Sequence, residues 1–296
     1  MNGLIAAIGQ YYRQELGNEN SPAIATLKTL IEFLKKDLSL TALGLRENVR
    51  SAIELLKNIE PITEVESVAE IYFRFITLKA SEYDKFHELK SELSRRSDVF
   101  LKKAMECRKK VAKNGHPFIS DGCTILIHGC SRAVNCTLAE AKKAHKIFTV
   151  FVTESAPDMS GKTMVEWLQS NGINSTLIID AAVAYIMEKV DIVLVGAEGV
   201  AESGGIINKI GTYSVAICAK SMNKPFYVLA ESYKFIRLYP LNQSDIPDRL
   251  KWKANRDFEN HPLVDYTPPS YITLLLTDLG TLTTAAVSDQ LMQLYL

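Results

Sequence analysis

Three short stretches carry residue types suited to holding a phosphorylated small molecule. "HGCSR", which ends at Arg132, combines an imidazole, a thiol, a hydroxyl and a guanidinium. "TESAPDMSGK" adds hydroxyls, carboxylates and a lysine, and "GAEGVAESGGIINK" ends in Asn208 and Lys209. Arginine and lysine supply the charge opposite to a phosphate, and glycines let backbone N–H groups approach it closely. The chemistry to expect is recognition of an anion.

The glycine-rich stretch fits no nucleotide-binding fingerprint. It contains neither GxGxxG nor GxxxxGK[ST], so a dinucleotide site and a P-loop are both excluded as predictions. Gly204 and Gly205 can present backbone N–H groups to an anion, while Lys209 adds a point charge. Arg132, near a helix start, can clamp a phosphate bidentately. The alternative is that these glycines merely turn the chain and Lys209 is solvated.

Two further side chains of "HGCSR" have a structural and a chemical interpretation. His128 ends an apolar run, a position typical of a structural histidine. Cys130 would act as a nucleophile only if a base or a positive charge lowered its pKa, and an inert cysteine is the commoner case. No His/Cys/Asp spacing indicates a metal site, so we predict neither metal nor cofactor, and a phosphate or phosphorylated small molecule is the ligand that suits these loops.

The elements that position these stretches are short β-branched runs separated by helix-length segments. The runs are "TILIHG", "IFTVFVTE", "STLIID", "DIVLVGA" and "PFYVLA". Runs that are apolar on both faces predict a parallel sheet covered by helices, here a doubly wound, mostly parallel, Rossmann-like α/β domain over residues 115–296. The three candidate loops follow the first, second and fourth runs, where ligands bind in such sheets.

Residues 1–114 have helical periodicity instead, and the turn-rich "NGHPF" marks the change. Ser21 and Pro22 predict the start of one amphipathic helix with Ile24, Leu27, Ile31 and Leu34 on one stripe. Further helices are predicted in "TALGLRENVRSAIELLKNI", in "VESVAEIYFRFITL" and from residue 81 to 113. The domain is therefore all-α, with "YFRF" as either core or a protein-binding surface around Arg74.

Composition restricts the class of partner. The chain has 296 residues, 47% of them hydrophobic, and 34 basic residues balance 34 acidic ones. Without a net positive charge we expect no direct nucleic acid or membrane partner. Five cysteines without CxxC pairing fit a reduced compartment, and the apolar stretch after Gly3 is too short for a signal peptide. A soluble cytosolic protein is the expectation.

The sequence resembles the translation initiation factor 2B alpha, beta and delta family over nearly its whole length, and its alpha branch most clearly. The segments that carry the resemblance are "VGAEGVAESGGIINKIGTYSVAICAK", "NKPFYVLAESYKF", "RLYPLNQSDIP" and "DYTPPSYITLLLTDLGTLTTAAVSDQLMQLYL". The resemblance implies a non-catalytic regulatory subunit of the guanine nucleotide exchange factor for initiation factor 2. It also implies a homodimer, formed through the α/β domains, that joins two sets of beta, gamma, delta and epsilon subunits into a decamer.

The same family includes isomerases of methylthioribose 1-phosphate and ribose 1,5-bisphosphate. Where those enzymes have a catalytic Cys and Asp, this chain has Gly129 and Gly205, and Ala156 replaces an arginine of theirs. Glycine cannot move a proton, so the resemblance implies a retained ligand pocket without catalysis. The residues predicted to bind a sugar phosphate are Ser131, Arg132, Glu198, Gly204, Gly205, Asn208 and Lys209.

The resemblance further implies that the helical domain binds the phosphorylated alpha subunit of initiation factor 2, which lowers exchange and translation initiation under stress. Thr41 and Arg74 are the predicted contacts. The alternative function is an active isomerase that uses Cys130 with Glu198 or Glu202. The apolar C-terminal stretch "YITLLLTDLGTLTTAAV" is either an internal strand or a subunit contact.

Overall fold

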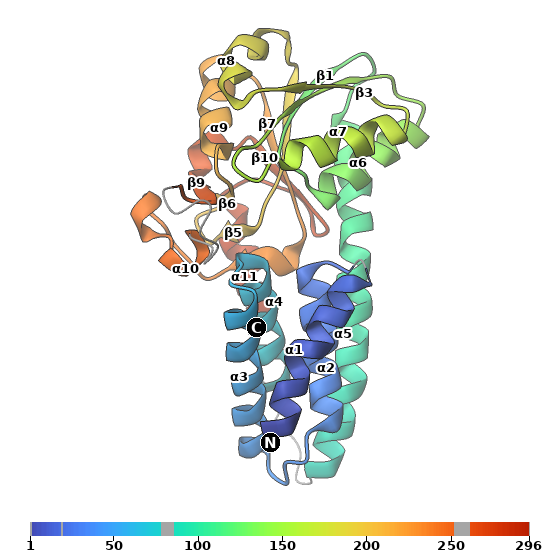
Figure 1. The fold of residues 1–296 in the computed structure, drawn as a ribbon, viewed down its shortest axis with the longest axis vertical. Coiled ribbons are helices and arrows are strands. Elements are labelled where there is room, and N and C mark those ends of the chain that lie inside the picture. The colour runs from blue at the N-terminus through green and yellow to red at the C-terminus, as the bar shows by residue number, and fades with distance from the viewer. Residues whose placement is uncertain (1, 19, 78–85, 252–260, 296) are drawn as a thin grey trace. The chain divides into compact units, whose positions relative to one another are not determined.

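The computed structural model describes residues 2–18, 20–77, 86–251 and 261–295 (Figure 1). The chain divides into two compact units: unit 1 is residues 1–106 with 292–296, and unit 2 is residues 107–291. The division falls inside α5 (Phe86–Gly115), whereas the sequence places the boundary after residue 114. Residues 81–85, the predicted start of the long helix, lie outside the described residues.

Unit 1 is helical, as predicted. Its helices are α1 (Asn2–Gly17), α2 (Pro22–Lys36), α3 (Ala42–Ile59), α4 (Thr63–Thr77) and the first part of α5. The stripe predicted on α2 is buried, and Leu27, Leu30 and Leu34 are fully inaccessible. Tyr12, Leu56 and Tyr72 from the neighbouring helices are fully buried as well, so this unit has an apolar core of its own.

Side-chain caps begin α2 and α3. The Oγ of Ser21 accepts a hydrogen bond from the N–H of Ile24 at 3.3 Å, and Pro22 is the first helical residue, which confirms the predicted start. Thr41 caps α3 by accepting from the N–H of Gly44 at 3.1 Å. Both caps satisfy amide groups that the first helical turn leaves without a partner.

The main sheet of unit 2 has seven strands in the order β11-β10-β7-β4-β1-β2-β3. All neighbours are parallel except the edge pair β10 and β11. The order reverses between β1 and β4, so the carboxyl ends of these two strands form the switch point at which such sheets bind ligands. The strands are β1 (Thr124–His128), β2 (Thr149–Thr153), β3 (Asn174–Ile178), β4 (Ile192–Gly196), β7 (Phe226–Ala230), β10 (Leu274–Thr277) and β11 (Gly280–Leu282).

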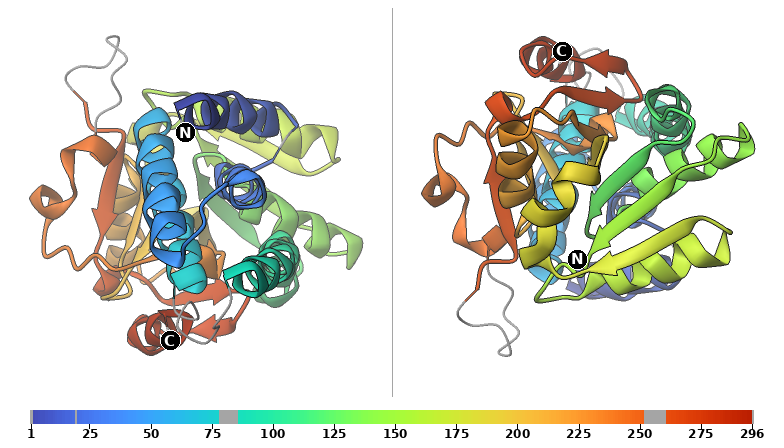
Figure 2. Two further views of the ribbon diagram at one scale, coloured as in Figure 1. Left: turned by 90° about the horizontal axis from the view of Figure 1, so that it is seen from below. Right: turned by 90° about the horizontal axis from the view of Figure 1, so that it is seen from above.

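Helices cover both faces of this sheet. On one face α6 (Arg132–Lys143) and α7 (Ser160–Ser170) pack against alternate residues of β1 and β2, such as Ile125 and Ile127. The short α8 (Val183–Ile186) and α9 (Thr212–Ser221) lie on the other side (Figure 2). The five predicted strands and the doubly wound α/β architecture are therefore confirmed.

A second, four-stranded sheet was not predicted. Its order is β8-β5-β6-β9, and its strands are β8 (Phe235–Ile236), β5 (Gly199–Ala201), β6 (Ile206–Lys209) and β9 (Val264–Thr267). The prediction of a loop from Gly196 to Lys209 is thus wrong, because β5 and β6 form an antiparallel hairpin there. Gly204 turns the hairpin at φ +83°, where a Cβ would lie 2.2 Å from the carbonyl oxygen of Thr284. Glycine is required at that position.

The C-terminal apolar stretch is internal in part. It contains β10 and β11, and Leu275 and Leu276 of β10 are fully buried. The remaining helices of the described chain are α10 (Asp248–Lys251) and α11 (Ala286–Tyr295). Within the described residues, none of the helices is both long enough and apolar enough to span a membrane.

Candidate functional site

The switch point of the main sheet brings the three predicted segments together. The chain leaves β1 at His128, and the following residues approach the end of β4 so closely that a Cβ on Gly196 would lie 2.3 Å from the Oγ of Ser131. Ser131 is the N-cap of α6, with its Oγ accepting from the N–H of Val134 at 3.5 Å. Arg132, the first residue of α6, is exposed beside it.

His128 is buried and fixed by hydrogen bonds on both ring nitrogens. Its Nε2 lies 2.8 Å from the carbonyl oxygen of Ile210, which can only accept, so Nε2 carries the hydrogen. Its Nδ1 then accepts from the hydroxyl of Thr153 at 2.6 Å. Burial lowers the pKa of His128, against opposing contributions from Ile210 and Asp180. The ring is therefore a neutral structural link, as its position at the strand end predicts.

The donors and acceptors form a directed chain from His128 to Gly129. Because the Thr153 hydroxyl donates to the ring, its oxygen accepts from the hydroxyl of Ser155 at 3.0 Å. The Ser155 oxygen in turn accepts from the N–H of Gly129 at 2.7 Å. The carboxylate of Asp180 holds the same loop by accepting from the N–H groups of Ser155 and Ala156 at 2.9 and 2.8 Å. The backbone around Gly129 is thereby preorganised.

Lys209 reaches this backbone from the second sheet. A Cβ on Gly129 would lie 3.7 Å from the Cγ and Cδ of Lys209 and 3.8 Å from the Oγ of Ser160. The Lys209 ammonium forms an ion pair with Asp158, and both side chains remain about one third exposed, at 31% and 35%. Residues of "HGCSR", "TESAPDMSGK" and the Asn208–Lys209 pair therefore meet at one place, where the Lys209 ammonium is about one third exposed.

Gly129 could not be replaced by cysteine without strain. A Cβ there would make only ordinary van der Waals contacts, but the φ of Gly129 is +75°, a conformation that side chains with a Cβ rarely adopt. Cys130 is exposed, and partial burial raises the pKa of its thiol despite the positive charges of Arg132 and Lys209, which lower it. The thiol is protonated at neutral pH, which is unfavourable for a nucleophile.

The space into which a side chain at Gly205 would extend is filled by an aromatic ring, which the sequence did not predict. A Cβ at this position would lie 2.6 Å from the ring and hydroxyl of Tyr266, which is 2% exposed. The Tyr266 hydroxyl is in turn 2.9 Å from the Oγ of Ser203. A carboxylate cannot be placed at position 205 while this ring stays where it is.

Asn208 and the turn after it are tied to α9 and β9. The Nδ2 of Asn208, itself 6% exposed, donates to Thr212, whose hydroxyl donates to the carbonyl of Lys209 at 2.6 Å. The N–H groups of Gly211 and Tyr213 donate to one oxygen of Asp265 at 2.8 and 3.1 Å. Asp265 was also missed, because nothing in the sequence links β9 to this turn. Glu198 lies half-buried between β4 and β5.

The two residues predicted to bind a protein partner lie in unit 1. Thr41 is exposed at the start of α3, and Arg74 is half-buried in the last turn of α4. Tyr72 is core, with its hydroxyl 2.9 Å from the Oγ of Ser97, and the guanidinium of Arg50 lies 5.4 Å from the centre of the Phe73 ring. "YFRF" is thus mostly core.

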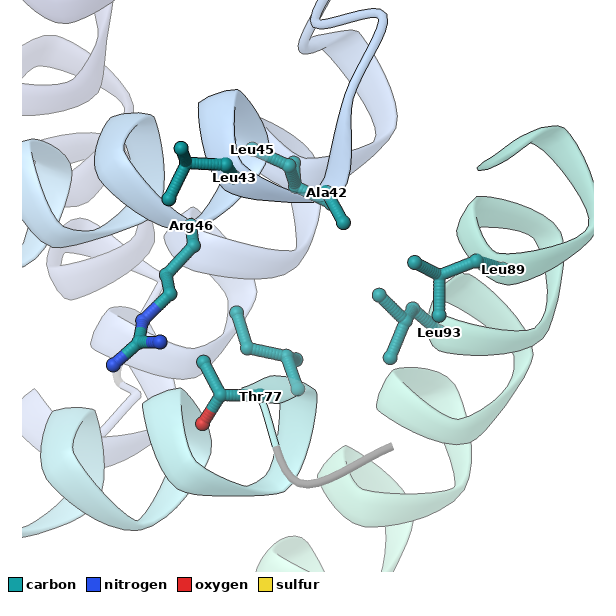
Figure 3. A pocket seen from close by; sticks show the side chains of 8 residues that line it. Ala42, Leu43, Leu45, Arg46, Thr77, Leu89 and Leu93 are labelled. Atoms are coloured by element: carbon teal, nitrogen blue, oxygen red, sulfur yellow. The ribbon is translucent and has the colours of Figure 1, made fainter. Parts of the chain in front are cut away.

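A hollow of about 200 Å³ opens between the first turn of α3, the last turn of α4 and the start of α5. Figure 3 shows Arg46 and Thr77 on one side of it and Leu89 and Leu93 on the other. Leu43, on its rim, is 65% exposed. The helix start that Thr41 caps and the helix end that carries Arg74 therefore border the same hollow.

Comparison with known proteins identifies the family. The model of the initiation factor 2 subunit family matches residues 16–284, which is most of the chain. The chain belongs to the initiation factor 2 subunit family. A relative from Dictyostelium discoideum, named translation initiation factor eIF2B subunit alpha, is 44% identical over 94% of this chain and 92% of its own length.

A solved structure shares the fold. A crystal structure of a tetrameric eIF2B-beta2-delta2 complex from C. thermophilum matches 99% of this chain and 94% of its own chain at a TM-score of 0.80 and 22% identity. An enzyme is related too: a ribose 1,5-bisphosphate isomerase from Archaeoglobus fulgidus is 32% identical over 79% of this chain and 76% of its own. The family resemblance inferred from the sequence is confirmed.

Proposed function

We propose that this chain is the alpha-type, non-catalytic regulatory subunit of the exchange factor for initiation factor 2. The observation that carries the proposal is the identity of 44% to an alpha subunit over nearly the full length of both proteins. In this role the chain works in the cytosol with beta, gamma, delta and epsilon subunits. Exchange itself is the task of those partners, and this chain assembles and regulates the complex.

The local geometry supports a subunit without isomerase activity. The proposed site lacks titratable groups at positions 129 and 205, strain disfavours a side chain at 129, and Tyr266 fills the space beside 205. The active isomerase stays the second candidate because an isomerase is among the relatives. Incubating the pure protein with ribose 1,5-bisphosphate and following the product by NMR separates the two, and turnover abolished by Cys130→Ala would establish the enzyme.

A sugar phosphate ligand is proposed for the site around Lys209. The partly exposed ammonium of Lys209 and the exposed Arg132 supply two cations near the end of β1. A bound phosphate would compete with Asp158 for Lys209. We expect ribose 1,5-bisphosphate to raise the melting temperature of the protein by mass action and Lys209→Ala to reduce that shift. A flat titration of the wild type at millimolar concentration would reject the ligand.

Recognition of the phosphorylated alpha subunit of initiation factor 2 is proposed for the hollow between α3 and α4. Arg46 adds a cation to the predicted pair Thr41 and Arg74, and exposed Leu43 adds apolar surface. Arginine is the residue best suited to a phosphoserine, so loss of Arg46 or Arg74 should weaken binding of the phosphorylated partner more than of the unphosphorylated one. Equal losses for both forms would contradict phosphate recognition.

Homodimerisation is proposed through the face that carries α8 and α9, which lie side by side in Figures 1 and 2. Large apolar side chains are exposed there, with Tyr185 at 77%, Ile179 at 59% and Ile217 at 42%. Exposed apolar surface of this kind is typical of protein interfaces. A second copy of the chain is the occupant that the proposed assembly requires.

The decisive experiment is reconstitution. The tagged chain is combined with the beta, gamma, delta and epsilon subunits, and the complex is analysed by mass photometry and by a guanine nucleotide exchange assay. We expect the chain to join two sets of partners into one decamer. Phosphorylated initiation factor 2 should inhibit exchange in its presence and much less in its absence. Failure to join the partners would reject the proposed function.

A further inference from the structure

The turn from Lys209 to Tyr213 is held between two buried side chains. On one side the Nε2–H of His128 donates to the carbonyl of Ile210 at 2.8 Å. On the other side Asp265 of β9 accepts from the N–H groups of Gly211 and Tyr213 through its Oδ2. The backbone that follows Lys209 is therefore clamped by groups that come from two different sheets.

The turn is packed tightly against the imidazole ring of His128. Gly211 has a φ of +100°, and a Cβ there would lie 2.9 Å from the Cε1 of the imidazole ring. Because the ring already lies against this backbone, the turn cannot approach His128 further, and the two hydrogen bonds to Asp265 restrain it from β9. A movement of the turn would also shift Lys209, because the carbonyl oxygen of Lys209 accepts a hydrogen bond from the Thr212 hydroxyl within the turn.

Asp265 is an unusual residue for a purely structural role. The side chain is 94% buried, since only 6% of it is exposed, and its Oδ1 has no hydrogen-bond partner among the described residues. Burial raises the pKa of Asp265 to about 7, although the two N–H groups favour the ionised form. Burying a carboxylate without a cation is costly, and the N-terminal end of α9 offsets only part of that cost.

Asp265 also occupies the amide groups that an anion would otherwise use. The first N–H groups of a helix are a common receptor for phosphate, and here two of them, at Gly211 and Tyr213, already bind a carboxylate. A phosphate at this site must therefore rely on the side chain of Lys209 and on the residues that follow β1. The direction of the Lys209 side chain then matters more than it would beside an open helix end.

We propose that Asp265 is a positioning residue of the ligand site: by accepting from the N–H groups of Gly211 and Tyr213 it fixes the turn, which His128 also holds, and so directs Lys209 over Gly129. The inference rests on the proposed sugar phosphate site. Asp265 touches no ligand itself and acts through the turn alone. Its effect on binding should therefore depend on an acceptor at position 265, which asparagine retains and alanine lacks.

The first test needs no ligand. Amide hydrogen exchange is measured for wild type, Asp265→Ala and Asp265→Asn. We expect Asp265→Ala to speed exchange of peptides covering residues 209–214 by about tenfold or more, while peptides of β1 and β2 keep their protection, and Asp265→Asn to restore most of it. The matched control is Asp191→Ala, which removes an exposed carboxylate that accepts from the N–H of Thr124. Unchanged exchange in Asp265→Ala would overturn the proposal.

The second test measures binding of ribose 1,5-bisphosphate by calorimetry. Asp265→Ala should weaken affinity about tenfold, Asp265→Asn less than about threefold, and Asp191→Ala not at all. Should the alanine variant not fold, Asp265→Ser, with a hydroxyl too short to reach both amides, replaces it in both tests. Wild-type binding that Asp265→Ala leaves intact would reject the positioning role. Absence of binding by the wild type would instead reject the proposed ligand site, and the exchange experiment then decides whether Asp265 holds the turn.

Discussion

At the scale of single residues, the candidate site consists of charged side chains that the sequence indicates and of buried side chains that only the structure shows. Arg132 and Lys209 stand out in the sequence because of their chemistry, and both keep exposed surface. Asp265 and Tyr266 are almost fully buried on β9, more than 50 residues downstream of the turn. Asp265 accepts hydrogen bonds from that turn, and Tyr266 packs beside Gly205. Their role follows from tertiary packing, which a single sequence does not reveal.

Asp265 makes stability depend on pH. Its folded pKa of about 7 exceeds the ordinary value of 3.8, so the folded state binds the proton more tightly than the unfolded state. The stability linked to this group is fully present below about pH 4 and is lost as pH rises to about 7. Between pH 5 and pH 8 we therefore expect the free energy of unfolding of the wild type to fall by about 2–3 kcal/mol relative to that of Asp265→Asn. Urea unfolding at both values measures it, and parallel changes in the two proteins would contradict the assignment.

Gly205→Ala should destabilise the protein. The new methyl group would meet the Tyr266 ring at 2.6 Å, and forcing extra atoms into a packed core costs about 1–3 kcal/mol. Gly17→Ala is the control, because a Cβ there meets nothing within 4 Å and alanine suits a helix better. Thermal unfolding should show a clear loss for Gly205→Ala and none for Gly17→Ala. Equal melting temperatures would show that the ring moves freely.

At the scale of elements, the strands of the main sheet were predictable and the second sheet was not. The apolar runs of β1, β2, β4 and β7 are long enough, and bounded clearly enough by helical segments, to be read directly. β8 has two residues and β5 has three, and glycines interrupt the hairpin, so no period-2 pattern can develop. The pairing of β6 with β9 needs long-range contacts that periodicity does not encode.

Thr41 serves α3 as a cap, and this role can be separated from partner binding. Thr41→Ala should cost about 1 kcal/mol of stability because the N–H of Gly44 loses its acceptor, whereas Thr41→Ser keeps the hydroxyl and most of the stability. Denaturant unfolding and a binding titration with the phosphorylated partner are measured on both variants. If Thr41→Ser weakens binding while stability holds, the methyl group or its shape contacts the partner; full binding by both variants would remove Thr41 from that surface.

At the scale of the whole molecule, the two units carry different proposed tasks. Unit 1 offers a hollow with arginine and leucine side chains, and unit 2 offers the ligand site and an apolar face. The sequence indicated this division through its change from helical to alternating patterns. The sequence did not show which apolar residues are exposed, because the same apolar residue types occur in cores and in interfaces, and only the folded structure distinguishes them.

The oligomeric state can be tested with a matched pair of surface substitutions. Tyr185 of α8 and Leu241, which lies after β8, are both 77% exposed, so a charge at either is tolerated by the fold. We expect Tyr185→Asp to shift sedimentation from dimer to monomer and Leu241→Asp to leave the dimer intact. A wild type that sediments as a monomer would reject the homodimer, and a dimer indifferent to Tyr185→Asp would place the contact elsewhere.

The ring of Tyr266 also limits which substitutions position 205 can accept in evolution. Placing an acid at Gly205 would need a smaller residue at 266, and each change alone is unfavourable: the acid collides with the ring, and the smaller residue leaves a void in the second sheet. Only their simultaneous appearance avoids a defective intermediate. The packing of Tyr266 therefore makes glycine at position 205 a requirement of folding, so a single substitution to an acid there would be selected against whatever the protein binds.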